Sequence, residues 1–225
     1  MSQGERKAGF ALALTGTPGV GKTTVKTHLE GIWRGGSRRG PRCVEVRDLL
    51  VPPGTPGARG GLPLGEPDMS RAIEPHEGAA LGPRRATVVV DMAKAAKALR
   101  ALTAQGLEVV VVGHLAHLLP VRRIVLLRCR PSELGRRLRA RGDPEEWVRA
   151  NQEAEWTDLI LFECLRTGLP VFEHDTSGES PDRTARWVAS VVAGSIRPSH
   201  GKIDWLSAEP PPPPGSLGRG KTISR

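Results

Sequence analysis

One eight-residue segment near the N-terminus restricts the possible folds more than any other feature of this chain. Residues 16–23, with the sequence GTPGVGKT, match the GxxxxGK[ST] pattern of a loop that wraps around phosphate groups. The apolar run Phe10–Leu14 precedes the loop and is typical of a short buried strand. Apolar residues at Val25, Leu29 and Ile32 follow at the spacing of a helix. The strand, loop and helix therefore occur in the order that phosphate binding requires.

The chemistry of such a loop is electrostatic. Successive backbone N–H groups and the N-terminus of the next helix point at phosphate oxygens, and glycines let the main chain approach them closely. Lys22 is expected to reach the β- and γ-phosphates, and the Thr23 hydroxyl to coordinate Mg²⁺. Losing one such donor or charge typically lowers the rate about 10²- to 10³-fold. Loss of Lys22 is therefore expected to remove most of the activity.

A second match to the same pattern lies at residues 215–222. It follows the proline run 210–214, so no strand is expected before it, and little chain remains for a helix after it. The first match has both flanking elements. We therefore predict that residues 16–23 bind phosphate and that residues 215–222 do not.

Length and cysteine content favour one domain of a cytoplasmic protein. With 225 residues and a mass of 24.2 kDa, the chain suits one α/β domain with insertions and is short for two. Cys43, Cys129 and Cys164 are widely spaced and contain no CxxC pair, so they indicate neither a disulfide framework nor a zinc site. The apolar stretch Ala8–Leu14 is brief and continues into the phosphate loop, so we expect neither a signal peptide nor a membrane span.

The chain is strongly basic, with a net charge of +9 and a pI near 10.3. A charge of this sign suits a partner rich in phosphate, such as RNA. The same excess also arises in a chain that is simply rich in Arg, Gly, Ala and Pro and poor in Lys. The charge alone leaves both interpretations open.

Short apolar runs recur along the chain and alternate with helical stretches. The runs lie at Phe10–Leu14, Cys43–Val46, Val88–Val90, Val109–Val112, Ile124–Leu127 and Leu169–Phe172. The helical stretches lie at Met92–Leu102, Ser132–Arg139 and Asn151–Leu165. Continuous apolar strands indicate a parallel sheet covered on both faces, and the alternation predicts a doubly wound α/β fold.

Two prolines mark the start of further helices. Asp143 and Ser180 stand in the N-cap position before Pro144 and Pro181. A short polar N-cap followed by proline is a common helix start, so helices are expected to begin at both prolines.

Two other segments have little periodicity. Residues 52–82 are crowded with Pro and Gly and are interpreted as a mobile insertion. The core pattern ends near Ile196, and residues 210–225 are predicted to form a disordered, basic, proline-rich tail.

An arginine-rich segment, RRLRARGD, lies at residues 136–143. Its arginines end one predicted helix, and a Gly-Asp turn precedes the next. In a phosphoryl-transfer enzyme, a hinged arginine segment can close over the triphosphate, neutralise developing charge and exclude water. The alternative is an exposed helix face that ends at Gly142. The nearby phosphate loop favours the first interpretation.

These motifs, taken in order, resemble the sixth adenylate kinase isoenzyme family of archaea and eukaryotes, over roughly residues 10–205. The matching segments are GTPGVGKTT, Asp48-Leu49, Gly113-His114, RLRARGD, Asn151–Glu155, Asp175–Gly178 and Lys202–Trp205. The resemblance implies a nucleoside-monophosphate kinase fold with a five-stranded parallel sheet. It divides the chain into a domain at residues 1–195, with an insertion at about 34–86 and a lid at about 139–151, and an extension at 196–225.

The resemblance also implies an activity and its partners. The activity is magnesium-dependent phosphoryl transfer between ATP and a monophosphate such as AMP, with an ATPase tied to late maturation of the small ribosomal subunit. A small-subunit ribosomal protein and rRNA are the implied partners, and a monomer or weak oligomer is expected.

The family's site residues transfer to this chain by position. Nucleotide contacts fall on Gly19, Gly21, Lys22, Thr23 and Thr24. The lid arginine is Arg141, and His114 receives a positioning role. Residues from about 34 to 64 would cover the monophosphate site. Asp48 in that segment either contacts substrate or caps a helix.

The chain departs from the family at one position. Many relatives carry an acidic residue just before the Gly-His pair, where this chain has Val112. That acid normally helps to hold Mg²⁺ or to orient water, so its absence weakens the case for efficient turnover. Asp91 and Glu108 are candidate replacements, although Asp91 is better interpreted as a helix N-cap. His117 is interpreted as surface or packing.

Two alternative functions remain open from the sequence. One is another small-molecule kinase of similar fold, such as a shikimate-type kinase that phosphorylates an alcohol. The other is a nucleotide-gated RNA-binding or ribosomal-protein-binding factor with little kinase activity, which the basic charge and Val112 favour.

Overall fold

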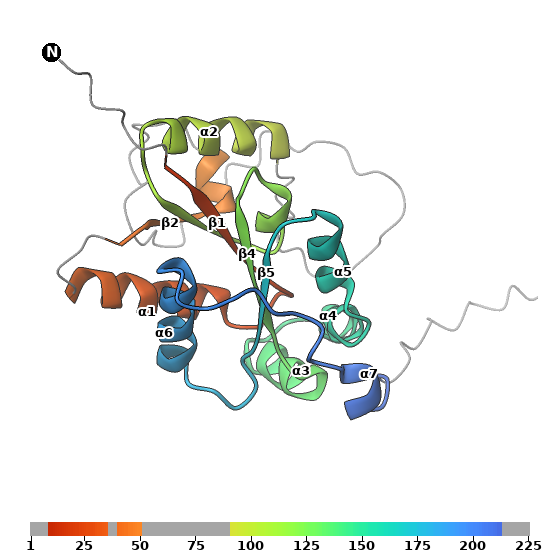
Figure 1. Cartoon of the computed structure of the whole chain (residues 1–225). Helices are drawn as coiled ribbons and strands as arrows, with labels where there is room; N and C mark the ends of the chain where they lie inside the picture. Colours follow the sequence, from red (N-terminus) through yellow and green to blue (C-terminus); the bar gives the residue numbers. More distant parts are fainter. Residues whose placement is uncertain (1–8, 36–39, 51–90, 213–225) are drawn as a thin grey trace, which may run out of the picture.

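The centre of the protein is a parallel β-sheet. The computed structural model describes residues 9–35, 40–50 and 91–212. The five strands run in the order β2-β3-β1-β4-β5 (Figure 1). They are β1 Ala11–Thr15, β2 Arg42–Glu45, β3 Val109–Val112, β4 Arg123–Arg128 and β5 Val171–Asp175. All residues of β1 and β3 are buried, because both faces of the sheet are covered. The predicted doubly wound α/β fold is confirmed.

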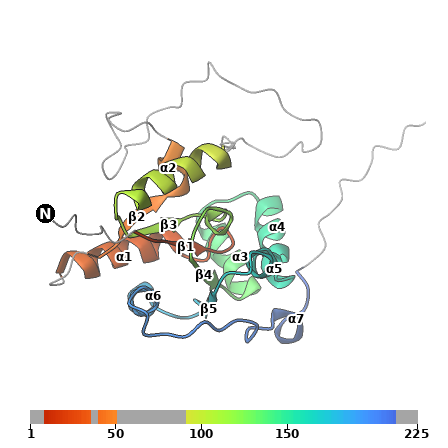
Figure 2. The same cartoon turned by 45° about the horizontal axis from the view of Figure 1, so that its top comes forward.

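Alternate residues of the central strand pack into two separate cores. Leu12 and Leu14 of β1 face α1 (Lys22–Gly35), α3 (Pro131–Ala140) and α6 (Pro181–Val192). Ala11 and Ala13 face the opposite layer, which contains α2 (Met92–Ala104), the short helix η1 (Val46–Leu50) and α5 (Leu159–Arg166). Figure 2 shows α2 and α1 on opposite sides of the sheet.

The remaining helices are α4 (Glu145–Trp156), η3 (Ala116–Leu118) and α7 (Trp205–Ala208). α4 packs against α3. Among the residues that the structure describes, no helix is long and apolar enough to cross a membrane. Since all five strands are parallel, their carboxyl ends meet at one edge of the sheet, where ligands of such folds bind.

The predicted apolar runs account for every strand of the sheet. Five of the six runs overlap β1 to β5. The sixth, Val88–Val90, lies outside the described residues, as do the predicted insertion 52–82 and the tail from residue 213 onward. The prediction of a helix start at Pro181 is confirmed, because Ser180 accepts a hydrogen bond from the backbone N–H of Arg183.

Two helix predictions were wrong in detail. The predicted helix 151–165 is divided into α4 and α5 at Asp158, which adopts a left-handed conformation with a φ of 58°. Asp143 lies one position before the N-cap of α4, which is Pro144. Its carboxylate accepts a hydrogen bond from Arg141 Nε at 2.6 Å, and the helix begins at Glu145 with Pro144 before it. In both places a charged side chain binds a partner outside the regular helix pattern.

The described part of the C-terminal extension packs on the domain. Ser199 pairs with the edge strand β5, since its N–H donates to Val171 O at 3.0 Å and its carbonyl accepts from Glu173 N at 2.9 Å. Asp204 caps the following helix α7. Trp205 in α7 is buried. The chain from residue 197 to 209 therefore extends the sheet edge and returns toward α3 and α4.

The three cysteines carry free thiols. Cys129 and Cys164 are buried, and Cys43 is partly buried. Burial, which disfavours the thiolate, raises the pKa of each thiol to about 12. The thiols therefore stay protonated and act as packing groups.

Candidate phosphate-binding site

The loop between β1 and α1 depends on glycine at three positions. Gly16, Gly19 and Gly21 have φ angles of 134°, 97° and 102°, a region that other residues rarely adopt. A Cβ atom on Gly16 would lie 2.2 Å from the carbonyl oxygen of Leu127, and one on Gly19 would lie 2.7 Å from Leu138 of α3. The glycines therefore permit both the curvature of the loop and its close packing against β4 and α3.

Lys22, the first residue of α1, folds back over this loop. Its Nζ atom donates to the carbonyl oxygens of Gly16, at 2.5 Å, and Thr17, at 2.9 Å. Burial lowers the pKa of Lys22 to about 7, against an opposing effect of Glu155 and with a smaller lowering by Arg141. Among the described residues, the ammonium thus has two neutral acceptors and no directly paired carboxylate, and a bound phosphate would supply the missing negative charge.

Thr23 and Thr24 occupy the first turn of α1 and are exposed at the carboxyl edge of the sheet. A magnesium ion bound with a nucleotide takes most of its ligands from phosphates and water and few from the protein. Thr23, an exposed residue at the end of the phosphate-loop motif, has a hydroxyl that fits this requirement. Among the described residues, no group of three or more His, Cys, Asp or Glu side chains could hold a metal without a nucleotide.

The acidic residue expected at the end of β3 has no replacement at Asp91 or Glu108. Asp91 is the N-cap of α2, and its carboxylate accepts from a backbone N–H at 2.9 Å, as the cap interpretation predicted. Glu108 precedes β3 and lies at the opposite edge of the sheet from Val112. Glu45 of β2 is in register with Val112, and its carboxylate pairs with Lys26 of α1 at 3.1 Å.

The predicted lid, at about residues 139–151, comprises the end of α3, a short turn and the first part of α4. Arg141 follows the last residue of α3, and Gly142 turns the chain with a φ of 81°. Arg137 and Arg139 are held by neighbours, since they donate to Glu133 and Glu145. Arg141 lies near enough to Lys22 to lower its pKa. The structure therefore divides the four arginines of the predicted run. Arg137 and Arg139 are held by ion pairs, Arg136 is exposed beside Glu133, and Arg141 lies near Lys22.

The two histidines after β3 have different environments. His114 reaches solvent but is partly desolvated by its surroundings. This desolvation is the largest cause that lowers its pKa, and the charges of Lys22 and His117 lower the pKa further, so its ring is neutral near pH 7. His117 is buried, which corrects the surface part of its interpretation. Its Nδ1 lies 3.1 Å from the Thr15 hydroxyl and its Nε2 lies 3.1 Å from Glu163. His117 therefore supports the end of β1, directly before the phosphate loop.

Asp48 lies in the middle of η1, after β2. Its carboxylate accepts a hydrogen bond from the backbone N–H of Glu45 at 3.3 Å, so it stabilises the start of this short helix. The side chain is 54% exposed, which leaves it open at the carboxyl edge of the sheet.

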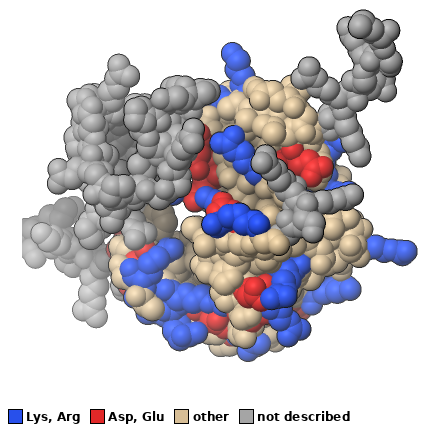
Figure 3. Space-filling view, turned by 90° about the vertical axis from the view of Figure 1, so that its left-hand side faces the viewer, with Lys and Arg blue, Asp and Glu red and all other residues tan. Residues whose placement is uncertain are grey.

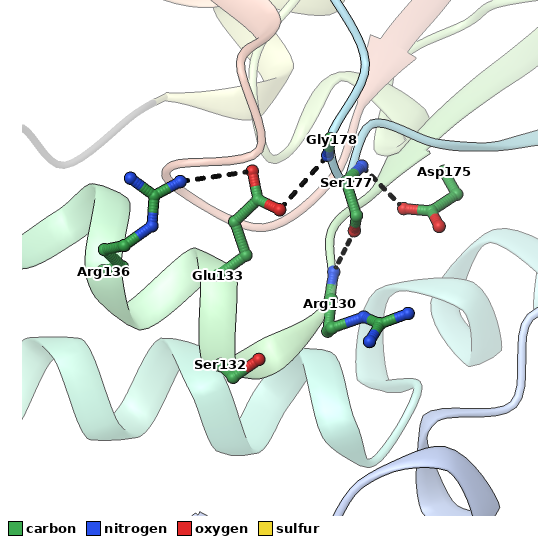
Figure 4. Close-up of a pocket in the computed structure, with 7 residues that line it drawn as sticks. All are labelled: Arg130, Ser132, Glu133, Arg136, Asp175, Ser177 and Gly178. Carbon is green, nitrogen blue, oxygen red and sulfur yellow. Dashed lines mark hydrogen bonds and ion pairs between the residues drawn. The ribbon is translucent and has the colours of Figure 1, made fainter.

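An open pocket of about 510 Å³ lies beside the phosphate loop, between the start of α3 and the loop from β5 to α6 (Figure 4). It is lined by Arg130, Ser132, Glu133, Arg136, Asp175, Ser177 and Gly178. The Thr176 hydroxyl lies 3.1 Å from the carbonyl oxygen of Val20, which ties the β5–α6 loop to the phosphate loop. Arg137 donates to the Thr176 carbonyl at 2.8 Å and ties the same loop to α3.

The C-terminal segment contacts Arg130 and Ser132, two of the residues that line this pocket. Glu209 accepts from the backbone N–H of Ser132 at 3.0 Å and from its hydroxyl at 2.6 Å. The same carboxylate lies 3.7 Å from the Nε of Arg130, and the ring of Trp205 lies 5.9 Å from the Arg130 guanidinium carbon. Sequence reasoning did not identify Arg130, Ser132 or Glu209 as site residues. The Asp175–Gly178 and Lys202–Trp205 motifs were the signals that pointed to this region.

Comparisons with known proteins show which sequences and structures this chain is similar to. A family model described as AAA domain matches residues 12–158. A Pyrococcus furiosus protein named "Putative adenylate kinase" is 30% identical over 195 residues, which cover 86% of this chain and 90% of that protein. A protein of the same name from Halobacterium salinarum is 32% identical over 197 residues, covering 86% of this chain and 96% of that protein.

A solved structure of a gluconokinase from Sinorhizobium meliloti is also similar, with 16% identity and a TM-score of 0.46, covering 84% of this chain and 94% of that one. The match to the AAA domain spans more than half of the chain, and it includes the phosphate loop, the lid turn and Glu155. By this match the chain belongs to the AAA domain family, and by its similarity to the two archaeal proteins over most of their length it belongs with these adenylate kinase-like proteins.

Proposed function

We propose that this protein is an ATP-dependent nucleoside-monophosphate kinase of the adenylate kinase type, with ATPase activity. The observation that carries the proposal is the glycine-dependent loop after β1, where Lys22 has two neutral acceptors and a pKa lowered to about 7. The adenylate kinase name of the archaeal relatives supports AMP, or another nucleoside monophosphate, as the acceptor.

In this proposal the phosphate loop binds the phosphates of ATP. The backbone N–H groups of residues 19–24 donate to the phosphate oxygens, and the N-terminus of α1 adds a favourable dipole. The Lys22 ammonium exchanges the carbonyl oxygens of Gly16 and Thr17 for the β- and γ-phosphates. The nucleoside of ATP occupies the neighbouring pocket, whose lining includes Arg130 and Ser177, joined by a hydrogen bond from the Arg130 backbone N–H to the Ser177 hydroxyl at 2.7 Å.

The reaction moves the terminal phosphoryl group of ATP to a phosphate oxygen of the monophosphate. The new P–O bond forms as the bond to the β-phosphate oxygen breaks, and ADP leaves. Arg141 neutralises the charge that develops on the transferring group, and the neutral ring of His114 positions the reactants. Mg²⁺, held by the Thr23 hydroxyl and the nucleotide, supplies further positive charge when bound.

The monophosphate is proposed to bind beside η1, on the segment at about 34–64. Of this segment the structure describes residues 34–35 and 40–50. The exposed carboxylate of Asp48 there is a candidate contact to the nucleoside hydroxyls or base of the acceptor.

An acceptor screen tests the proposed function. With ATP and Mg²⁺ present, ADP release is expected to increase when AMP is added and to stay at the slow ATPase rate with shikimate or gluconate. Coupled ADP detection measures the rate, and chromatography identifies the phosphorylated acceptor. Phosphorylation of an alcohol, with none of any nucleoside monophosphate, would replace this proposal by the small-molecule kinase alternative.

A second candidate is a role in maturation of the small ribosomal subunit, with a ribosomal protein or rRNA as partner. The net charge of +9 and the resemblance to the sixth isoenzyme family support it. Surface arginines of the described residues are partly neutralised, as on α6, where Arg183 pairs with Glu179 and Arg186 with Asp182. Figure 3 shows basic and acidic side chains interspersed on one face.

Salt dependence distinguishes specific RNA binding from a merely basic composition. If the protein neutralises five phosphates of single-stranded RNA, its affinity is expected to fall about a hundred-fold between 50 and 200 mM salt. Fluorescence anisotropy with a labelled RNA measures this change. An affinity that does not change with salt would argue against RNA as a partner and would leave the kinase proposal intact.

A further inference from the structure

We infer that Glu155 is a positioning residue, which fixes the phosphate loop to the end of helix α4 through its buried carboxylate. The inference rests on the proposed function, because it assigns a role in the use of ATP to a residue outside the loop, the lid and the pocket.

Glu155 contacts Thr17, which also accepts a hydrogen bond from Lys22. The Thr17 carbonyl accepts from the Lys22 ammonium at 2.9 Å, while the Thr17 hydroxyl donates to Glu155 Oε2. Thr17 is 1% exposed and Glu155 is 2% exposed, so water does not compete for this hydrogen bond. The position of Thr17, and with it one acceptor of Lys22, therefore depends directly on Glu155.

The Glu155 carboxylate is itself held from the opposite side. Its Oε1 accepts from Arg128 Nε at 2.5 Å and from the backbone N–H of Cys129 at 3.2 Å. Arg128 also donates to the main-chain oxygen of Glu155 at 3.0 Å. Because donors from the end of β4 bind both the side chain and the main chain of Glu155, neither can shift without breaking several hydrogen bonds.

Arg128 is a fully buried cation with three carboxylate partners. Besides Glu155, it donates to Asp158 and, at 2.7 Å, to Glu173 of β5. Burial alone would lower the pKa of Arg128, but Glu155 and Asp158 reverse this effect and raise it. Buried ion pairs often contribute no more stability than apolar packing of the same volume. A contribution to stability is therefore a weak explanation for burying these charges together. The contact of Glu155 with Thr17 of the phosphate loop is a stronger one.

The location of Glu155 in α4 extends this connection to the lid. α4 begins at Glu145, directly after the Arg141–Pro144 turn, and Glu155 lies one residue before its end. Asp158, two residues beyond the end of α4, has a left-handed conformation, and its carboxylate pairs with Arg128. One end of α4 therefore follows the lid arginine and the other contacts the phosphate loop, so Glu155 fixes how the two lie relative to each other.

The test compares three variants. Glu155→Gln keeps the size of the side chain and removes its charge, and Thr17→Val removes the hydroxyl alone. Each is expected to lower kcat/KM for ATP about 10- to 100-fold, since a small displacement of a positioning group has an effect of this size. The double variant is expected to be no worse than the more affected single variant, because both remove one shared contact. Asp158→Asn removes a partner of Arg128 without contacting the loop, so it is expected to lower Tm while kcat/KM stays near the wild-type value.

Calorimetric measurement of ATP affinity, with Tm for each variant, separates the possible outcomes. Equal losses of kcat/KM in Glu155→Gln and Asp158→Asn, in proportion to lost stability, would show a merely structural role and overturn the inference. Wild-type kinetics in Thr17→Val would overturn it as well, even if Glu155→Gln does not fold. If the wild-type protein binds ATP but phosphorylates no acceptor, the proposed function fails, and the ATP affinities of Thr17→Val and Glu155→Gln still test the positioning role.

Discussion

Replacing Lys22 by alanine is expected to lower kcat/KM for ATP about 10²- to 10³-fold. The ammonium lies over the phosphate loop, where the carbonyl oxygens of Gly16 and Thr17 accept its hydrogen bonds. A phosphate would bind it more strongly than these neutral groups do, because the attraction between opposite charges in a partly buried site adds to the hydrogen bond. Both ATP binding and phosphoryl transfer use this charge, so KM is expected to rise and kcat to fall. Coupled ADP release over a range of ATP concentrations measures both constants.

The matched control is Lys97→Ala, which removes an exposed lysine from α2. It changes the net charge by the same amount at a distance from the loop, so its kinetic constants are expected to equal those of the wild type. Circular dichroism and Tm show whether the Lys22 variant remains folded. Wild-type turnover by a folded Lys22→Ala protein would contradict the assignment of residues 16–23 as the phosphate site.

The sequence predicted the sheet and the phosphate loop because both are local features. Continuous apolar runs identify strands buried on both faces, and five of the six predicted runs are strands of the sheet. The loop pattern fixes its own conformation, since three of its glycines adopt positive φ angles. The loop pattern occurs twice in the sequence. Residues 16–23 were chosen as the phosphate site because a predicted strand and helix flank them, whereas residues 215–222 have neither.

Contacts between distant residues were not predictable from the sequence. Thr17 and Glu155 lie 138 positions apart, and no periodicity indicates that they meet. The same holds for Ser132 and Glu209, which are 77 positions apart. The division of the predicted helix 151–165 also involves a contact between distant residues, because the left-handed Asp158 pairs with Arg128 at the end of β4.

The arginine-rich segment shows what the structure adds to a motif. In the sequence, the pattern of residues 136–143 does not distinguish its four arginines, and the family resemblance alone selects Arg141. In the structure, Glu133 holds Arg137 and Glu145 holds Arg139, whereas Arg141 pairs with Asp143 within the turn itself. Arg141 is therefore paired within its own turn, while Arg137 and Arg139 are paired with residues of α3 and α4.

Replacing Arg141 by alanine is expected to lower kcat about 10²- to 10³-fold, with a smaller change in the KM for ATP. Its guanidinium is 43% exposed and lies close enough to Lys22 to lower the pKa of that residue, so it faces the region where the transferring phosphoryl group is proposed to lie. An interaction that is made mainly in the transition state affects kcat more than substrate binding. Steady-state kinetics with ATP and AMP measure this difference.

Arg100→Ala on α2 serves as the control, because it removes an exposed arginine far along the sequence from the lid turn. Arg141→Lys adds a second comparison. A lysine retains the charge but not the planar, bidentate geometry of the guanidinium, so it is expected to restore only part of the lost kcat. A KM for ATP raised about 10²- to 10³-fold, with kcat unchanged, would assign Arg141 to ground-state binding of ATP. The charge that stabilises the transferring group would then have to come from Lys22 and the loop amides, since Arg137 and Arg139 are held by Glu133 and Glu145.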